Sequence, residues 1–131
     1  MDVAGETEKI TINLGFIDLG QIDLLVQEGF YSNRTDFIRT AIRNQLTTHA
    51  DVVKHTVARK SLLLGLHYYT RRALEAVRAA HQKLQIQVLG LARIAEDVFP
   101  ELARDTIDSL AVLGVLQASP AVKAALADRI R

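Results

Sequence analysis

The chain has 131 residues, no cysteine and a formal net charge of +1. The lack of cysteine excludes disulfides, thiolate metal sites and cysteine nucleophiles. The sequence shows neither a secretory leader nor an apolar run of the roughly 18 residues that a membrane span needs, so we expect a cytoplasmic protein. The apolar fraction of 49% and the charged fraction of 24% are those of a globular chain.

The charge is unevenly distributed along the chain. Residues 1–48 hold four basic and seven acidic side chains, a balance of −3, whereas residues 49–131 hold 12 basic and eight acidic ones, a balance of +4. Composition alone therefore gives no general electrostatic argument for nucleic-acid binding.

The first predicted element is a strand over residues 8–14, where apolar and polar side chains alternate. The apolar side chains are Ile10, Ile12 and Leu14, and the polar ones between them are Lys9, Thr11 and Asn13. A lone strand leaves its backbone unpaired, and the next stretch carries helical signals throughout. We therefore expect this strand to pair with another chain.

The second predicted element is a helix capped by Asp18, with Gln21 completing a capping box and Ile17 and Ile22 forming a hydrophobic staple. Its apolar face comprises Leu19, Ile22, Leu25 and Val26. Gly29 suits the left-handed position that ends a helix, so we expect a tight turn there.

A second helix is predicted to start at Asn33, with Asp36 three residues on and Ser32 as the competing cap. Arg39 and Arg43 lie together on this helix, apart from its apolar face. The buried face is predicted to comprise Phe37, Ile38, Ala41, Ile42 and Leu46.

The alternating strand from Lys9 to Leu14 and the run from Gly29 to Arg39 resemble the Arc/MetJ/CopG ribbon-helix-helix superfamily. The resemblance covers about a third of the chain. It implies a homodimer whose paired strands enter the major groove of double-stranded DNA, above a core made by four helices. It also implies that Lys9, Thr11 and Asn13 read the bases.

The chemistry of these residues suits the implied roles. Lys9 can donate to guanine, Asn13 can donate and accept at adenine, and Thr11 can do either or contact the thymine methyl. The resemblance also implies a DNA phosphate at the start of the second helix, held by Asn33, Arg34 and Thr35 through free backbone N–H groups.

Residues 49–131 show a weak repeat built around Gly65, Gly90 and Gly114, spaced 25 and 24 residues apart. We predict that a helical connector over residues 49–55 leads into three strand-helix units. The predicted strands are Ser61–Tyr69, Leu84–Ile94 and Leu110–Ala118. The helical segments carry Leu74 and Val77, then Leu102 and Ile107, then Val122 and Leu126, with Pro100 and Pro120 near helix starts.

The predicted fold class is α+β, with a ribbon-helix-helix domain over residues 1–48 and a small β/α repeat domain over residues 49–131. The second domain fits either a short solenoid or a compact βα regulatory domain closed between subunits. Either form exposes edges, so we expect association beyond the dimer.

Other candidate sites have simpler explanations. His49, His55, His67 and His81 include no pair at the i, i+4 spacing, so we predict neither a metal site nor a cofactor. The Tyr68-Tyr69 and Arg71-Arg72 pairs are typical of core and solvated surface, and the acids from Glu96 to Asp108 surround a helix start. We see no nucleophile-base pair and predict no enzyme.

The predicted function is that of a DNA-binding transcriptional regulator, most simply a repressor. Two alternatives stay open. One is an antitoxin-like autoregulator, although residues 49–131 look folded and not like a disordered toxin-binding tail. The other is a scaffolding protein in which the ribbon only makes dimers, as the acidic N-terminal balance would allow.

Overall fold

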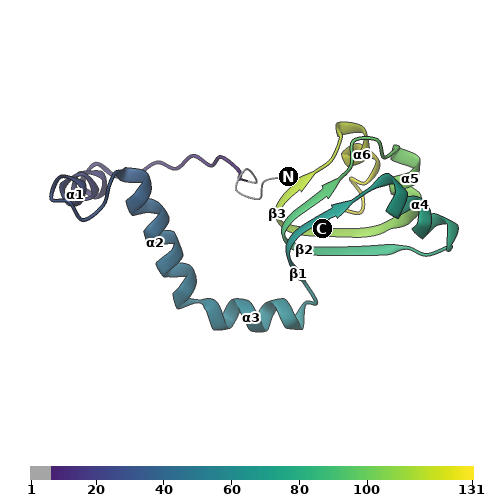
Figure 1. Ribbon diagram of the computed structural model, residues 1–131, viewed down its shortest axis with the longest axis horizontal. Helices are drawn as coiled ribbons and strands as arrows, with labels where there is room; N and C mark the ends of the chain where they lie inside the picture. Colours follow the sequence, from purple (N-terminus) through teal and green to yellow (C-terminus); the bar gives the residue numbers. More distant parts are fainter. Residues whose placement is uncertain (1–6) are drawn as a thin grey trace. The chain divides into compact units, whose positions relative to one another are not determined.

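The computed structural model describes residues 7–131, and the chain divides into two compact units, residues 1–54 and 55–131 (Figure 1). Unit 1 contains helices α1 (Phe16–Gln27) and α2 (Arg34–Thr48). Helix α3 (Ala50–Arg59) begins in unit 1 and ends in unit 2, which confirms the predicted helical connector. No helix within residues 7–131 is long and apolar enough to cross a membrane.

The start of α1 differs from the prediction. The helix begins at Phe16, and its N-cap is Gly15, which is extended and offers no side chain for capping. Asp18 therefore lies inside the first turn of α1 and does not cap the helix. Its negative charge is still favourable there, because the N-terminal end of the helix dipole is positive. The predicted staple is wrong too, because Ile17 is exposed while Ile22 is buried.

The end of α1 is as predicted. Gly29 has a φ of +85°, the left-handed conformation that glycine adopts at least cost. Its N–H donates to the Val26 carbonyl at 3.1 Å, and the Phe30 N–H donates to the Leu25 carbonyl at 3.0 Å. These two bonds form a Schellman motif, which satisfies the last carbonyls of α1 and turns the chain toward α2.

Residues 7–15 carry no helix or strand in the single chain. A strand needs a backbone partner, and the prediction assigns that partner to a second copy, so the intersubunit strand stays a prediction. The side chains of this segment are exposed, including those of Ile10, Ile12 and Leu14.

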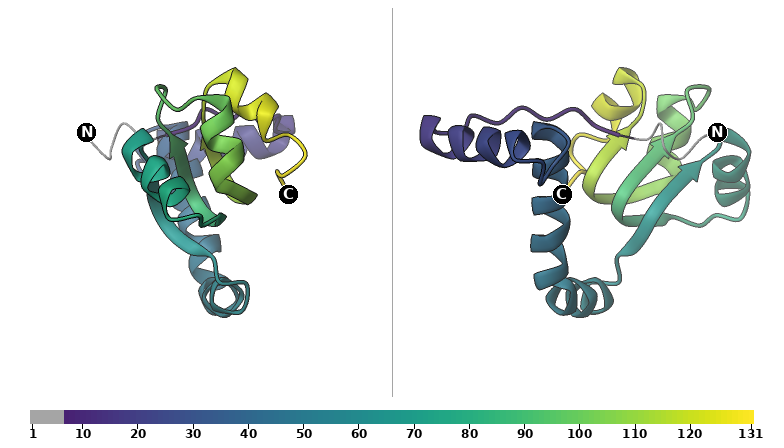
Figure 2. Two further views of the ribbon diagram at one scale, coloured as in Figure 1. Left: turned by 90° about the vertical axis from the view of Figure 1, so that its right-hand side faces the viewer. Right: turned by 60° about the vertical axis from the view of Figure 1, so that its left-hand side comes forward.

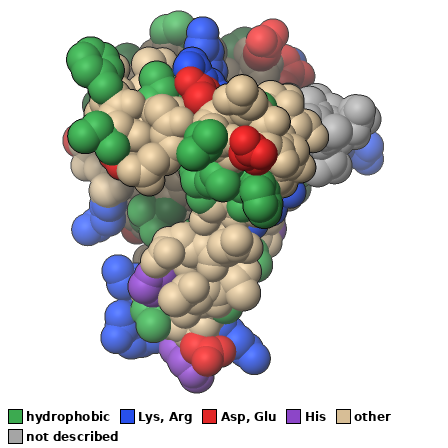
Figure 3. Space-filling model, turned by 90° about the vertical axis from the view of Figure 1, so that its left-hand side faces the viewer, with side chains coloured by type: hydrophobic (Ala, Val, Ile, Leu, Met, Phe, Trp, Pro, Cys, Tyr) green, Lys and Arg blue, Asp and Glu red, His purple; other side chains and the backbone are tan. Residues whose placement is uncertain are grey.

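Unit 1 buries little of its own apolar surface. The predicted inner face of α1 is confirmed, since Ile22 is buried and Leu19, Leu25 and Val26 are half-buried. The predicted face of α2 is covered only at its start: Phe37 and Ile38 are half-buried, whereas Ala41 is exposed and Ile42 and Leu46 are 47% and 59% exposed. Hydrophobic side chains accordingly gather at the surface in Figure 3.

Unit 2 is a parallel three-stranded sheet with one helix after each strand, as the repeat predicts. The strands are β1 (Leu63–Tyr69), β2 (Leu84–Ile94) and β3 (Ile107–Gln117), and they lie side by side in chain order (Figures 1 and 2). The helices are α4 (Arg71–Ala79), α5 (Pro100–Thr106) and α6 (Pro120–Ala125). The strand of each repeat thus pairs with the strand of the next repeat, an arrangement that both the short solenoid and the compact βα domain allow.

The strand predictions for unit 2 are close to the structure. The β2 bounds are confirmed, and β1 and β3 differ by a few residues at their ends. Pro100 and Pro120 occupy first-turn helix positions as expected. The placement of Ile107 in a helix is wrong, because α5 ends at Thr106 with no connecting loop and the fully buried Ile107 begins β3.

The three repeat glycines form one row across the sheet. Gly65 pairs with Gly90, and Gly90 pairs with Gly114, and all three have φ values between +120° and +136°. A Cβ on Gly90 would lie 2.2 Å from the Gly65 carbonyl oxygen, and one on Gly114 would lie 2.1 Å from that of Gly90. At Gly90 and Gly114 the neighbouring backbone therefore approaches too closely for any side chain, whereas Gly65, on the outer strand, has no atom within 4 Å of its Cβ position.

The core of unit 2 lies between the sheet and its three helices. It includes Leu74 of α4, Leu102 of α5 and Val122 of α6, packed against four side chains of β2: Ile86, Val88, Ala92 and Ile94. All three helices therefore cover one face of the sheet.

The last residues of the chain cover the start of the free β3 edge, where the Leu110 N–H donates to the Arg129 carbonyl at 3.0 Å.

Candidate nucleic-acid interface

The start of α2 is held by two reciprocal side-chain caps. The Asn33 side chain accepts from the Asp36 N–H at 2.8 Å, which confirms the predicted N-cap. The Asp36 carboxylate accepts in turn from the Ser32 N–H at 2.9 Å, one residue ahead of the position in a standard capping box. These bonds fix the first turn of α2 against the chain that enters it.

An ion pair joins the two helices of unit 1 at the same place. The Arg34 guanidinium donates to both carboxylate oxygens of Asp23 at 2.8 Å, and this bond holds the pKa of Asp23 below its ordinary value. The side chain of Arg34 is thus turned toward α1. If Arg34 contacts a phosphate, it therefore does so through its backbone N–H and not through its guanidinium.

The first turn of α2 presents open backbone donors. The earliest N–H groups with partners are those of Asp36, bonded to the Asn33 side chain, and Phe37, bonded to the Asn33 carbonyl. The N–H groups of Arg34 and Thr35 lie ahead of them, at the positive end of the helix dipole. This geometry suits an anion such as a phosphate.

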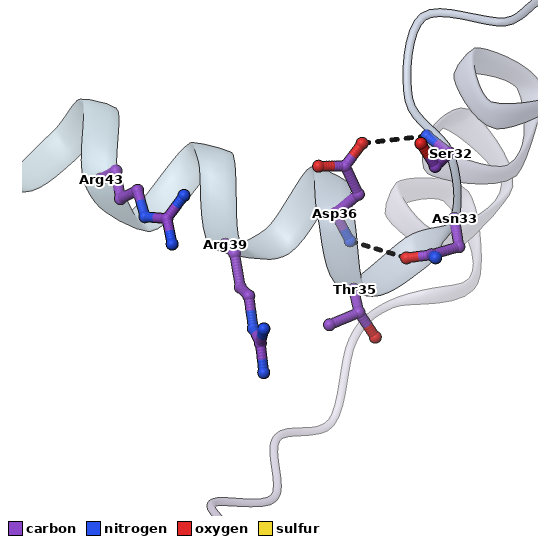
Figure 4. Close-up of a pocket in the computed structure, with 6 residues that line it drawn as sticks. All are labelled: Ser32, Asn33, Thr35, Asp36, Arg39 and Arg43. Carbon is purple, nitrogen blue, oxygen red and sulfur yellow. Dashed lines mark hydrogen bonds between the residues drawn. The ribbon is translucent and has the colours of Figure 1, made fainter. Parts of the chain in front are cut away.

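An open cavity of about 370 Å³ adjoins this turn (Figure 4). Three of its side chains, Thr35, Arg39 and Arg43, project to one side of α2, because residues four apart share a helical face. Neither arginine has an ion-pair partner among residues 7–131. With two arginines against the single carboxylate of Asp36, the cavity lining carries a net positive charge although residues 1–48 are acidic overall.

The structure places the predicted site residues in two sets. Lys9, Thr11 and Asn13 lie exposed in the segment before α1, and Asn33, Arg34 and Thr35 lie at the start of α2. Sequence reasoning places Arg39 and Arg43 together but assigns them no role. Thr35, Arg39 and Arg43 are spaced four residues apart, and this spacing is the signal that could have added the two arginines to the predicted phosphate site.

The histidines form no shared centre. His49 caps α2, where its ring lies 3.2 Å from the Gln45 side-chain nitrogen, and His55, His67 and His81 lie in three other segments. The described part of the chain holds no cluster of three or more His, Asp or Glu side chains suited to a metal ion. The buried Nε2 of His67 has no hydrogen-bond partner there.

Comparison with known proteins identifies the class. Residues 5–123 match the model of the Ribbon-Helix-Helix transcriptional regulator family, so the chain belongs to this family of DNA-binding regulators. The match extends well beyond the N-terminal third that the sequence motifs indicated and takes in most of unit 2.

One curated relative matches a short part of the chain. An uncharacterized protein from Methanocaldococcus jannaschii is 42% identical over 40 residues, which are 30% of this chain and 41% of the relative. The match thus spans less than half of the relative's length. No solved structure is significantly similar to the chain.

Proposed function

We propose that the protein is a homodimeric, sequence-specific DNA-binding repressor that reads the major groove with a ribbon formed by residues 8–14 of two chains. The observation that carries the proposal is the segment itself. It alternates polar and apolar side chains, exposes Ile10, Ile12 and Leu14, and has no backbone partner within residues 7–131. Pairing with a second copy would satisfy its backbone and bury the three apolar side chains.

In this arrangement the other face of the ribbon carries the base readers. Lys9, Thr11 and Asn13 alternate with the apolar side chains, so all three point away from the dimer core. They supply an ammonium, a hydroxyl and an amide, which match the donors and acceptors of the major groove. Two copies related by a twofold axis would read a short palindromic site.

The cavity at the start of α2 would hold the DNA backbone. The N–H groups of Arg34 and Thr35 and the side chain of Asn33 can orient one phosphate, and Arg39 and Arg43 can neutralise it. Backbone N–H groups supply partial positive charge without basic side chains. This explains how an N-terminal region with a balance of −3 can still bind DNA.

Quantitative DNA binding by matched variants tests these roles. Operator DNA would first be selected from a random pool by the purified full chain. Asn13→Ala and Lys9→Ala are expected to lose about 1–3 kcal/mol of discrimination at the bases they read. Arg39→Ala should instead weaken binding to all sequences. It should also lower the slope of log binding constant against log salt concentration by about 2, because each chain of the dimer loses one phosphate contact.

Two results would count against the proposal. An unchanged base preference in Lys9→Ala and Asn13→Ala would remove the base-reading assignment. Failure of the parent chain to select any DNA would favour the scaffolding alternative, which the acidic balance of residues 1–48 supports.

A further inference from the structure

The two faces of the sheet in unit 2 have very different surroundings. Helices α4, α5 and α6 cover the face that carries the even-numbered side chains of β2. None of these three helices lies over the opposite face. Both faces of a parallel sheet are usually covered by protein. We therefore expect a further protein surface to cover this face.

The uncovered face is apolar across all three strands. Its centre, which we name the open leucine face, consists of two rows given by the strand register: Leu64, Leu89 and Leu113, then Leu66, Leu91 and Val115. Leu64 of β1 is 68% and Leu113 of β3 57% exposed, while between them on β2 Leu89 is half-buried and Leu91 is buried at 5%. An exposed apolar surface that runs over adjacent strands is typical of an interaction site.

The charges around the open leucine face restrict what can cover it. The next row is Tyr68, Arg93 and Gln117, in which Arg93 donates to Gln117 at 2.7 Å and lies over the Tyr68 ring. Ahead of the leucines lie Gln85 and Gln87 of β2. With a single charged side chain, this face offers too little positive charge for DNA or an anionic membrane surface, and it suits an apolar protein surface.

We propose that the open leucine face packs against the same face of a second copy of this chain. This inference rests on the proposed dimer, because pairing through unit 1 brings two copies of unit 2 together at high effective concentration. A self-complementary apolar face needs no other partner, and a twofold axis through its centre passes near the middle strand. Two sheets packed face to face lie about 10 Å apart. With the helices on their outer faces they would form four layers in the order helix, sheet, sheet and helix.

Single-cysteine cross-linking tests the pairing in the full chain, which has no cysteine of its own. Leu89→Cys places a thiol on the middle strand of the open leucine face, and Glu101→Cys places one on exposed α5, in the helix layer. Both variants carry the same unit 1. Under mild oxidation we expect disulfide-linked dimers to form at least tenfold faster from Leu89→Cys than from Glu101→Cys.

Adjacent leucines of β1 provide a matched pair of further substitutions. Leu64 belongs to the open leucine face, whereas Leu63 pairs with Val88 on the helix side, and both are more than half exposed (68% and 51%). Added to Leu89→Cys, Leu64→Lys should slow cross-linking at least tenfold because two lysines would oppose the pairing. Leu63→Lys should leave the rate within twofold.

The outcomes separate this proposal from the proposed function. Equal cross-linking of Leu89→Cys and Glu101→Cys, with DNA binding retained, would overturn the pairing of the open leucine face and assign the face to a different protein. Equal effects of Leu63→Lys and Leu64→Lys would overturn it as well. Faster cross-linking of Leu89→Cys in a chain that binds no DNA would instead support the pairing of the open leucine face and refute the proposed DNA-binding ribbon.

Discussion

The two units of this chain reach stability in different ways. In unit 2, all three helices and the inner face of the sheet share one buried core, centred on residues such as Leu74, Val88 and Leu110. In the described part of unit 1, Ile22 is the only hydrophobic side chain that is fully buried. The comparison indicates that unit 2 folds around its own core, whereas unit 1 buries few apolar side chains of its own and would complete a core only in the proposed dimer.

The same contrast appears in the way each unit leaves apolar surface exposed. Unit 1 exposes apolar surface on the segment 7–15 and on helices α1 and α2, and these elements bury few other side chains that could stabilise them. Unit 2 exposes it on the outer face of a sheet that is already anchored on its inner face. Loss of a partner should therefore unfold unit 1 but leave unit 2 folded.

The largest expected effect comes from placing a charge on the uncovered face of α2. Ile42→Glu should raise the dissociation constant of the dimer at least 100-fold, because two copies would each lose about 1.5–3 kcal/mol of apolar burial and gain a buried charge. DNA binding should fall with it. Sedimentation measures the dimer, and Asn44→Glu, on the opposite side of α2, is the control that should stay dimeric.

The core of unit 2 should be most sensitive at the glycine row. Gly90→Ala should destabilise unit 2 by more than about 4 kcal/mol, since its Cβ would meet a backbone oxygen that cannot move away. Gly65 has a similar φ but no atom within 4 Å of its Cβ position, so Gly65→Ala should cost only the backbone strain, about 1–3 kcal/mol. Denaturant unfolding measures both, and equal losses would contradict the role of the close approach.

The sequence predicted the elements whose signals are local. Alternation and glycine spacing located the three strands, and Asn33 and Gly29 marked the helix ends, because caps and turns depend on a few neighbouring residues. The start of α1 was missed because Asp18 and Gln21 imitate a capping box, whereas the chain already turns at Gly15. A local pattern cannot show which of two adjacent starts packs better.

The parts of the candidate site that depend on tertiary structure were less accessible. Nothing in the sequence indicated that Arg34 would bind Asp23, eleven residues away, so that only its N–H is left for the proposed phosphate contact. The pairing of Gly65, Gly90 and Gly114 in one row likewise depends on strand register, which the repeat spacing suggests but does not fix.

The caps of unit 1 provide a smaller test. Asn33→Ala should destabilise the dimer by about 1 kcal/mol per chain, because the Asp36 N–H loses its acceptor. Asp18→Ala should cost less, about 0.3–1 kcal/mol, since Asp18 contributes only its charge near the start of α1. Thermal unfolding of both variants at one protein concentration makes the comparison, and a larger loss for Asp18→Ala would restore it as the cap.

The smallest expected effect is a pH-dependent one at the end of unit 2. Arg104 donates to the Asp128 carboxylate at 2.9 Å, and this bond lowers the pKa of Asp128 below its ordinary 3.8. A lowered folded-state pKa means that the ion pair stabilises unit 2 above pH 3.8 and that this contribution is lost as the pH falls through the lower, folded value. Asp128→Asn should therefore lower the free energy of unfolding slightly at neutral pH and not at all in stronger acid, because both proteins then lack the charge. Since the pair is exposed, solvent screening keeps the difference small, and added salt should reduce it further. A difference between the two proteins that persisted in acid would show that Asp128 acts through packing and not through its charge.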